Sequence, residues 1–213
     1  MRTICTEGAK HSGASHDHPE VSLHIVPLAR HMHHLDHGEH QDIANLLLAS
    51  AEKLASIGAQ MLISPDSSVH AAMPFVLPKS PLPWLSVSEV VAEAALIAGY
   101  KKLGLLGTNW VIDSGVYQAT LAAYRMGCAT PPKATTEAID DIMVSEMFLG
   151  IHKIESFRFL QAAAQELKKQ GCEAIILGTS EMSLMLTTEN LGIPVLSPAK
   201  LLAQEALRCV ANV

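Results

Sequence analysis

Three short apolar runs of the sequence each follow a longer segment with the pattern of a helix. The runs are bounded by Gly, Pro or Ser, and they lie at residues 62–63, 103–106 and 175–177. A strand returns to run parallel to its neighbour only through a long crossover, which is usually a helix. Apolar strands that alternate with helices therefore predict an α/β fold with a parallel sheet, in the three-layer αβα arrangement.

Helices are expected around these runs. Glycine stands where the C-terminal cap of a helix belongs at four places, namely Gly58, Gly99, Gly127 and Gly171. The pattern predicts helices over residues 41–56, 87–98, 114–126, 136–149, 156–170 and 199–210.

A weak internal repeat indicates how these elements are organised. LASIGAQMLISPDSSVHAAM (54–73) and LKKQGCEAIILGTSEMSLML (167–186) share a helix end, a glycine, a strand, a small-residue turn and a restart that contains Met. When Gly58 is matched with Gly171, Asp66 aligns with Thr179. A chance recurrence of these common features is the alternative interpretation.

Two further segments extend the repeat. PWLSV after the first copy and PVLSP after the second both predict a strand led by proline, which places Ser86 opposite Ser197. MRTICTEG at the start of the chain is similar to KKLGLLGT (101–108), and both are interpreted as strands that end in Gly or Thr.

The repeat predicts two similar α/β halves. We expect residues 1–98, completed by a C-terminal helix over 199–213, to form the first half and residues 99–198 to form the second. Ligands of open α/β sheets bind outside the carboxyl ends of the strands. The turns of the two halves would then line one cleft, with Asp66 and Thr179 facing each other across it.

Charge and cysteine content narrow the class of partner. The formal charge of −6 argues against nucleic acid or an anionic membrane, because those surfaces need an excess of Lys and Arg, and a small metabolite fits better. The cysteines lack CxxC spacing, and no leading apolar stretch resembles a signal peptide, so we expect a reducing cytoplasm. The cysteines are Cys5, Cys128, Cys172 and Cys209.

Three motifs resemble those of the cofactor-independent aspartate/glutamate racemase family, which includes hydantoin racemases, maleate isomerase and arylmalonate decarboxylase. They are GYKKLGLLGT, ESFRFLQAAAQELKKQGCEAIILGTSEM and PDSSVH, and the resemblance covers residues 54–206. It implies two pseudo-symmetric Rossmann-like domains with the site in the cleft between them. It also implies an isomerase of amino acid metabolism that uses neither pyridoxal phosphate nor a metal, and a homodimer.

The family's two catalytic cysteines fall on Asp66 and Thr179, so both thiols are replaced. The typical family member has Cys-Asn-Thr-x-His where this chain has PDSSVH, and Gly-Cys-Thr-Glu where it has GTSEM. The family's Gly-rich loop and first helix after the first strand are also missing, and TEGAKHSGASHDHPE stands in their place.

Hydroxyl groups occupy the remaining motif positions. The resemblance implies that they bind the substrate carboxylate and stabilise the enolate-like charge, together with backbone N–H groups at helix starts. They belong to Ser67, Ser68, Thr108 and Ser180, and Glu181 and His70 are further candidates beside the same turns.

The replaced cysteines limit the chemistry. Racemisation needs a base on one face of the α-carbon and an acid on the other, and a Thr hydroxyl titrates too high to serve as either. Asp66 is a plausible single base or acid if a partly dry cleft raises the pKa of its carboxyl. The implied enzyme acts on the carbon next to a carboxylate in a small amino or dicarboxylic acid, and two-base racemisation is doubtful.

Several alternatives stay open. One base still permits a lyase, decarboxylase or isomerase reaction, and loss of both thiols also suits an inactive relative that only binds a small acid. Glu181, His70 or Cys5 could replace a missing thiol. Their structural alternatives are a helix cap for Glu181, a core histidine bonded to the backbone for His70, and a buried strand-end residue for Cys5. Asp66 also stands in good turn and N-cap sequence.

The histidine-rich stretch RHMHHLDHGEH suggests a metal, because His33, His37 and His40 could share one face of a helix. Gly38 interrupts that helix, and no cysteine joins the set. We therefore expect no functional metal site here, and adventitious capture of nickel or zinc instead.

Overall fold

The computed structural model describes residues 1–211, except the side chains of His11, Ser12 and Ala211. The predicted C-terminal segment thus extends by two residues, 212–213, beyond the described part. Two compact units make up the chain. The first unit contains Met1–Pro65, Val69–Val87 and the segment from Ala199, and the second contains Asp66–Ser68 and Ser88–Pro198. The predicted division at residue 99 stays a prediction.

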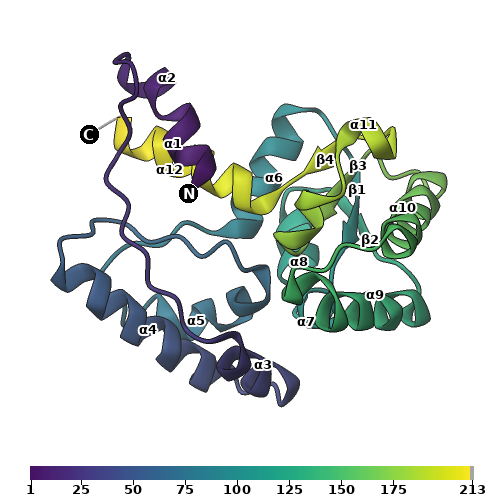
Figure 1. Ribbon diagram of the computed structural model, residues 1–213, viewed down its shortest axis with the longest axis horizontal. Helices are drawn as coiled ribbons and strands as arrows, with labels where there is room; N and C mark the ends of the chain where they lie inside the picture. Colours follow the sequence, from purple (N-terminus) through teal and green to yellow (C-terminus); the bar gives the residue numbers. More distant parts are fainter. Residues whose placement is uncertain (212–213) are drawn as a thin grey trace. The chain divides into compact units, whose positions relative to one another are not determined.

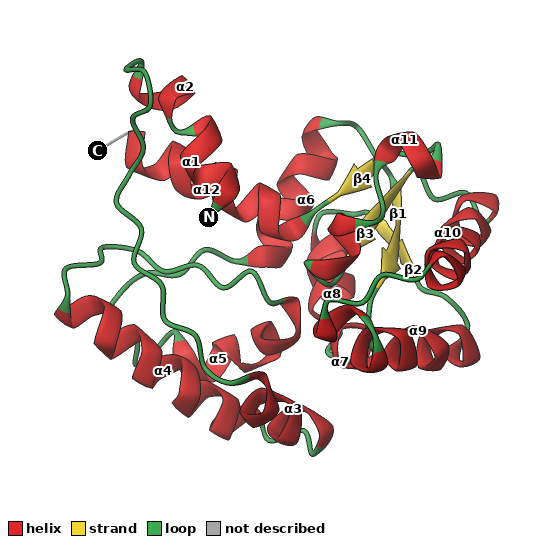
Figure 2. Ribbon diagram, viewed as in Figure 1, coloured by secondary structure: helices red, strands yellow, loops and turns green. Residues whose placement is uncertain are grey.

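A four-stranded parallel sheet forms the centre of the second unit, with strand order β2-β1-β3-β4 (Figure 2). In register, Gly104 of β1 lies opposite Ile175 of β3, and Leu106 lies opposite Leu177. The predicted α/β class and the strands at 103–106 and 175–177 are confirmed. The strands are β1 (Lys102–Leu106), β2 (Gly127–Ala129), β3 (Ala174–Leu177) and β4 (Val195–Leu196).

Helices cover this sheet, and Figure 1 shows α6 and α8 across the sheet from α10. Helices α9 and α10 bury one face, where Ile139, Leu160 and Leu167 pack against Leu106 and Ile175. The helical elements of the second unit are α6 (Val87–Ile97), α7 (Asn109–Asp113), α8 (Val116–Ala123), α9 (Lys133–Ser145), η2 (Met147–Leu149), α10 (Ile154–Lys169), η3 (Glu181–Leu184) and α11 (Thr188–Leu191).

Two details of this unit differ from the sequence-based expectation. The helix expected over 114–126 is the shorter α8, which begins at Val116 because Gly115 before it adopts a left-handed φ of 68°, and α7 is a separate helix that was not expected. Gly99 and Gly171 have positive φ, as expected of C-terminal caps, but Gly127 does not. Gly127 begins β2 and donates its N–H to the Lys101 carbonyl, while Arg125 takes the left-handed conformation.

The first unit is mostly helical. Helix α4 packs Ile43 and Leu47 against Val69 and Val76, and a second cluster joins Ile4 of α1 to Leu207 of α12. The elements are α1 (Arg2–Glu7), α2 (Ala9–Ser12), α3 (Leu28–Asp36), α4 (His40–Ser56), α5 (Met73–Val76) and α12 (Pro198–Ala211), and η1 (Ser67–Ala72) belongs to this unit from Val69 on. Within residues 1–211, no helix is long and apolar enough to cross a membrane.

The predicted first strand is wrong. Residues 2–7 form helix α1, whose buried residue Ile4 packs on α12, so Cys5 is an exposed helical residue and not a strand end. The strands expected at residues 62–63 and after Pro83 are reduced to one parallel bridge between Leu62 and Trp84. Two paired residues satisfy too few backbone groups to extend a sheet, and neighbouring segments of this unit are helical.

Gly104 allows α10 to approach β1 closely. A Cβ atom at Gly104 would lie 2.8 Å from Cδ1 of Ile175 and 3.0 Å from Cβ of Leu167, and both side chains are fully buried. We expect Gly104→Ala to lower the free energy of unfolding by about 1–3 kcal/mol through overpacking, measured by urea denaturation.

Gly127→Ala is the matched control, since Gly127 is exposed on β2 and its nearest neighbour would be the flexible Lys102 side chain at 3.3 Å. The control should change the midpoint little. Equal midpoints for Gly104→Ala and the unsubstituted chain would contradict this packing of α10 on β1.

Candidate active site

Strands β1 and β3 both end in a Gly-Thr turn, Gly107-Thr108 and Gly178-Thr179. The Gly178 N–H donates to the Leu106 carbonyl at 2.6 Å, which holds the two turns side by side. A Cβ atom at Gly178 would lie 2.9 Å from that carbonyl oxygen and 3.2 Å from the Gly107 Cα. Glycine is therefore required for the turns to meet at the carboxyl edge of the sheet.

Thr108 carries a buried hydroxyl that the fold does not satisfy. The residue is 1% exposed, and no hydrogen-bond partner for its Oγ1 is found among residues 1–211. Thr108 occupies the N-cap position of α7, but its side chain makes no capping hydrogen bond. A buried hydroxyl left without a partner costs about 1–3 kcal/mol, so this atom is well suited to a ligand.

Asp140 on α9 binds the first residue of α7. Its Oδ1 accepts the Asn109 backbone N–H at 2.9 Å, and its Oδ2 accepts the Asn109 side-chain amide. Burial raises the pKa of the Asp140 carboxyl, the hydrogen bonds from Asn109 oppose that rise, and the charges of Asp141 and Asp113 add to it. Asp140 thereby fixes the backbone directly after Thr108.

Asp66 and Ser68 form a local turn. The Oδ1 atom of Asp66 accepts the Ser68 N–H at 3.0 Å and the Ser68 hydroxyl at 2.7 Å, which is the turn chemistry given above as the alternative role for Asp66. Ser68 is buried and Asp66 is exposed. The turn holds one oxygen of the Asp66 carboxylate in a fixed position.

Ser67 connects this turn to α8. Its hydroxyl shares a hydrogen bond of 2.8 Å with the hydroxyl of Tyr117, and both residues are buried. Burial raises the pKa of the Tyr117 phenol, the hydrogen bond with Ser67 lowers it, and the charge of Asp66 raises it. Tyr117 therefore stays neutral and anchors the Asp66–Ser68 segment on the second unit.

The hydroxyl groups of the second Gly-Thr turn make only weak or solvent-exposed hydrogen bonds. The Thr179 hydroxyl donates to the Met143 sulfur at 3.8 Å, a weak contact, and Thr179 is half-buried. Ser180 is exposed and donates its hydroxyl to Oε2 of Glu181 at 3.1 Å. Glu181 thus accepts a neighbouring hydroxyl, and η3 has no side-chain cap.

His70 has a structural role in the first unit. Its Nε2 lies 3.0 Å from the Ser64 carbonyl oxygen, and because a carbonyl only accepts, Nε2 carries the proton. The side chain is buried. This arrangement matches the core histidine that the sequence analysis gave as the alternative to a site role.

The structure thus brings Thr108, Thr179 and Ser180 to neighbouring turns of the second unit, and the Asp66–Ser68 segment belongs to the same unit. That Asp66 faces Thr179 stays a prediction. Sequence reasoning missed Tyr117 and Asp140. Tyr117 is one of three tyrosines in the chain, which is a usable signal, but no motif marks Asp140.

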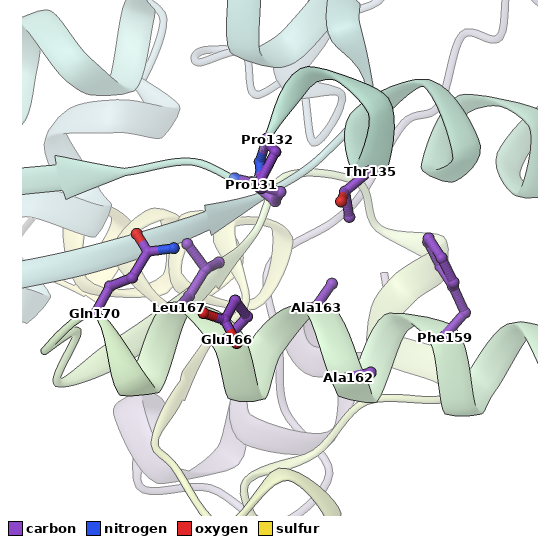
Figure 3. A pocket seen from close by; sticks show the side chains of 9 residues that line it. All are labelled: Pro131, Pro132, Thr135, Phe159, Ala162, Ala163, Glu166, Leu167 and Gln170. Carbon is purple, nitrogen blue, oxygen red and sulfur yellow. The ribbon is translucent and has the colours of Figure 1, made fainter.

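A groove of about 230 Å³ lies between the start of α9 and α10 (Figure 3). Its lining is largely apolar, with Pro131 and Pro132 opposite Leu167 and Phe159, and it includes the carboxylate of Glu166. The volume is below the range typical of ligand pockets, about 300–1,000 Å³. Since the described lining contains neither Lys nor Arg, the groove does not suit an acidic ligand.

Comparison with known proteins agrees with this geometry. A crystal structure from Yersinia pestis, named as a candidate Asp/Glu racemase, is 25% identical and covers 100% of this chain and 92% of its own, with a TM-score of 0.85. An aspartate racemase homologue from Pyrococcus horikoshii OT3 is 20% identical with the same coverages and a TM-score of 0.79, a likeness of fold.

Sequence comparison extends this likeness. An uncharacterized protein of the pnlA 3′ region of Pectobacterium carotovorum subsp. carotovorum is 27% identical over 105 residues, which are 49% of this chain and 69% of that protein. The sequence model of the Asp/Glu/hydantoin racemases matches residues 5–206. The chain therefore belongs to the Asp/Glu/hydantoin racemase family.

Proposed function

We propose that this protein is a cofactor-independent enzyme that acts on the carbon next to a carboxylate in a small amino or dicarboxylic acid. The observation that carries the proposal is the buried, unpaired hydroxyl of Thr108 beside the second Gly-Thr turn. Ligands of parallel sheets bind at this carboxyl edge. A carboxylate oxygen is the natural acceptor for such a hydroxyl, and charged acceptors make the stronger hydrogen bonds.

The roles of the remaining groups follow from their chemistry. Asp66 serves as base or acid, with its carboxylate oriented by Ser68. Ser67, Ser68 and Ser180 supply further hydroxyls for the substrate carboxylate and for the charge that develops on removal of the α-proton. Thr179 cannot exchange a proton with carbon near neutral pH, so the site works from one face only.

A one-sided site supports proton exchange with retention, β-elimination, or decarboxylation followed by reprotonation. The names of the relatives favour an aspartate- or glutamate-like acid, since the Yersinia pestis and Pyrococcus horikoshii proteins are named for Asp/Glu and aspartate racemases. A cytoplasmic location and a homodimer complete the proposal as predictions.

The second candidate is an inactive relative that binds a small acid. Its support is the local use of the site groups, because the Thr179 hydroxyl contacts Met143 and the Ser68 hydroxyl is bonded to Asp66. Both candidates use Thr108 to bind the acid, and they differ in whether Asp66 moves a proton.

Thr108→Val removes the unpaired hydroxyl and keeps the buried volume. We expect aspartate or glutamate to bind more weakly by about 1.5–3 kcal/mol, roughly tenfold to a hundredfold in Kd, measured by titration calorimetry. The free protein should be as stable as before or more so, because an unsatisfied buried group is lost.

Thr120→Val is the control for these two expected effects, weaker binding of the acid and unchanged or higher stability. The Thr120 hydroxyl is bonded to Ser88 and to the Val116 carbonyl, so its loss should destabilise the protein and leave the affinity for the acid unchanged. Unchanged affinity in Thr108→Val would remove Thr108 from the site.

Proton transfer by Asp66 is tested in D₂O with L- and D-aspartate and glutamate, by following the α-hydrogen with NMR. We expect exchange without inversion, and a fall of at least about 10²-fold in Asp66→Asn, the usual loss on removal of a general base. Asp141→Asn, at an exposed position of α9, is the control. Exchange with inversion would instead establish racemisation, and thermal stabilisation by an acid without exchange would establish the binder.

Thr179→Cys restores a group that can carry a proton on the second face. We expect inversion at the α-carbon to appear or to increase, detected as optical rotation or by chiral chromatography. Ala134→Cys, at an exposed position of α9, is the control and should give no inversion. Equal results for the two variants would count against placing the second face of the reaction at Thr179.

A further inference from the structure

The corner between α3 and α4 in the first unit gathers three side chains that can bind a metal ion. One ligand atom from each of His33, His34 and Glu39 lies within 4.8 Å of the other two. His34 and Glu39 are half-buried and His33 is exposed, so an ion can reach the group from solvent.

The backbone brings Glu39 back to the end of α3. Gly38 adopts a left-handed φ of 66°, its N–H donates to the Leu35 carbonyl at 3.2 Å, and the Glu39 N–H donates to the His34 carbonyl at 2.9 Å. This pair of bonds is the Schellman ending of a helix. Gly38 interrupts the helix, and the same residue brings Glu39 back to the two histidines.

Hydrogen bonds within the corner already hold the group together. The Nδ1–H of His34 donates to Oε2 of Glu39 at 2.6 Å, and this bond lowers the pKa of the Glu39 carboxyl. Transfer of the ring proton from Nδ1 to Nε2 leaves a lone pair on Nδ1 of His34, so an ion can take the place of the hydrogen between Nδ1 and Oε2 of Glu39.

His37 lies beside this group. Its Nδ1 is 2.7 Å from the His33 carbonyl oxygen, so Nδ1 carries the proton and Nε2 of the neutral ring carries the lone pair. The rings of His33 and His37 have centroids 4.8 Å apart, as expected for positions i and i+4 on one face of a helix.

We propose that this corner binds one divalent ion of the zinc class through His33, His34 and Glu39, with His37 available as the fourth ligand. Imidazole and carboxylate are borderline ligands that suit Zn²⁺, and Cu²⁺ and Ni²⁺ share the preference for imidazole. Bond lengths of 2.0–2.1 Å in a tetrahedron place ligand atoms about 3.4 Å apart. The three ligand atoms lie within 4.8 Å of one another, and side-chain rotation, above all of the exposed His33, would bring them to this spacing.

The ion would stabilise the structure and takes no part in the proposed reaction. The group shares no residue with the Gly-Thr turns, and it joins the last turn of α3 to the residue before α4. None of the residues of α3, all described, is buried, so a metal would supply an attachment that packing supplies only weakly. The inference does not depend on the proposed function.

The test uses the untagged full chain after dialysis against a chelator, titrated with ZnSO₄ in a calorimeter at pH 7.5. We expect one Zn²⁺ per chain and a rise of Tm on addition of Zn²⁺. Glu39→Gln, His33→Gln and His34→Gln should each weaken Zn²⁺ binding at least tenfold, and each should abolish the rise of Tm. His152→Gln, an exposed histidine of the second unit, should retain both.

Co²⁺ provides a second measurement, because a tetrahedral site with two or three imidazoles gives strong visible absorption. Without metal, the variants should melt near the unsubstituted chain, because none of the three replaced side chains is buried. If Glu39→Gln and His34→Gln bind Zn²⁺ as tightly as the unsubstituted chain does, the binding is adventitious capture by surface histidines and the proposal is overturned. Absence of binding at 100-fold excess Zn²⁺ would overturn it as well.

Discussion

The close approach of β1 and β3 at their carboxyl ends is the constraint on which the second unit depends. Leu106 lies opposite Leu177, and the Gly178 N–H donates to the Leu106 carbonyl. Gly178 has no room for a side chain, and Gly104 lower in β1 has none beneath α10. Because neither glycine has a side chain, neighbouring segments can approach the backbone closely at both positions. The two Gly-Thr turns meet as a consequence of this pairing.

Several polar side chains near the two turns are hydrogen-bonded to other residues of the protein. Asp140 caps α7 through Asn109, Tyr117 binds the Ser67 hydroxyl, and Ser68 binds Asp66. These pairs are close hydrogen bonds, whereas the Thr179 hydroxyl of the second turn makes only a weak contact with the Met143 sulfur. The Thr108 hydroxyl has no partner among residues 1–211, although Thr108 stands at the N-cap of α7. A pattern of satisfied neighbours around one unsatisfied hydroxyl is what a preorganised ligand site requires.

In the proposed function, the residues that replace both family cysteines limit the reaction to one face of the substrate. A carboxylate at residue 66 can accept a proton, while the hydroxyl of a threonine at residue 179 can donate or accept a hydrogen bond but does not take up a proton near neutral pH. The fold and the glycines of the turns are kept, and the symmetry of the two acid–base groups is lost. The first unit supplies a separate feature, a His-His-Glu corner whose geometry depends on the Schellman ending at Gly38.

The sequence by itself determined the strands at the centre of the second unit, most helices, and the glycines that end them, because burial and left-handed turns leave local patterns. It also pointed to Thr108 and to the turn at Thr179 through the family motifs. Tertiary structure decided the rest. Residues 2–7 form a helix because Ile4 packs on α12, about two hundred residues away in the chain, and Gly127 begins a strand because Lys101 accepts its N–H. The roles of Asp140 and Tyr117 depend on partners from other elements, and local sequence carries no record of such partners.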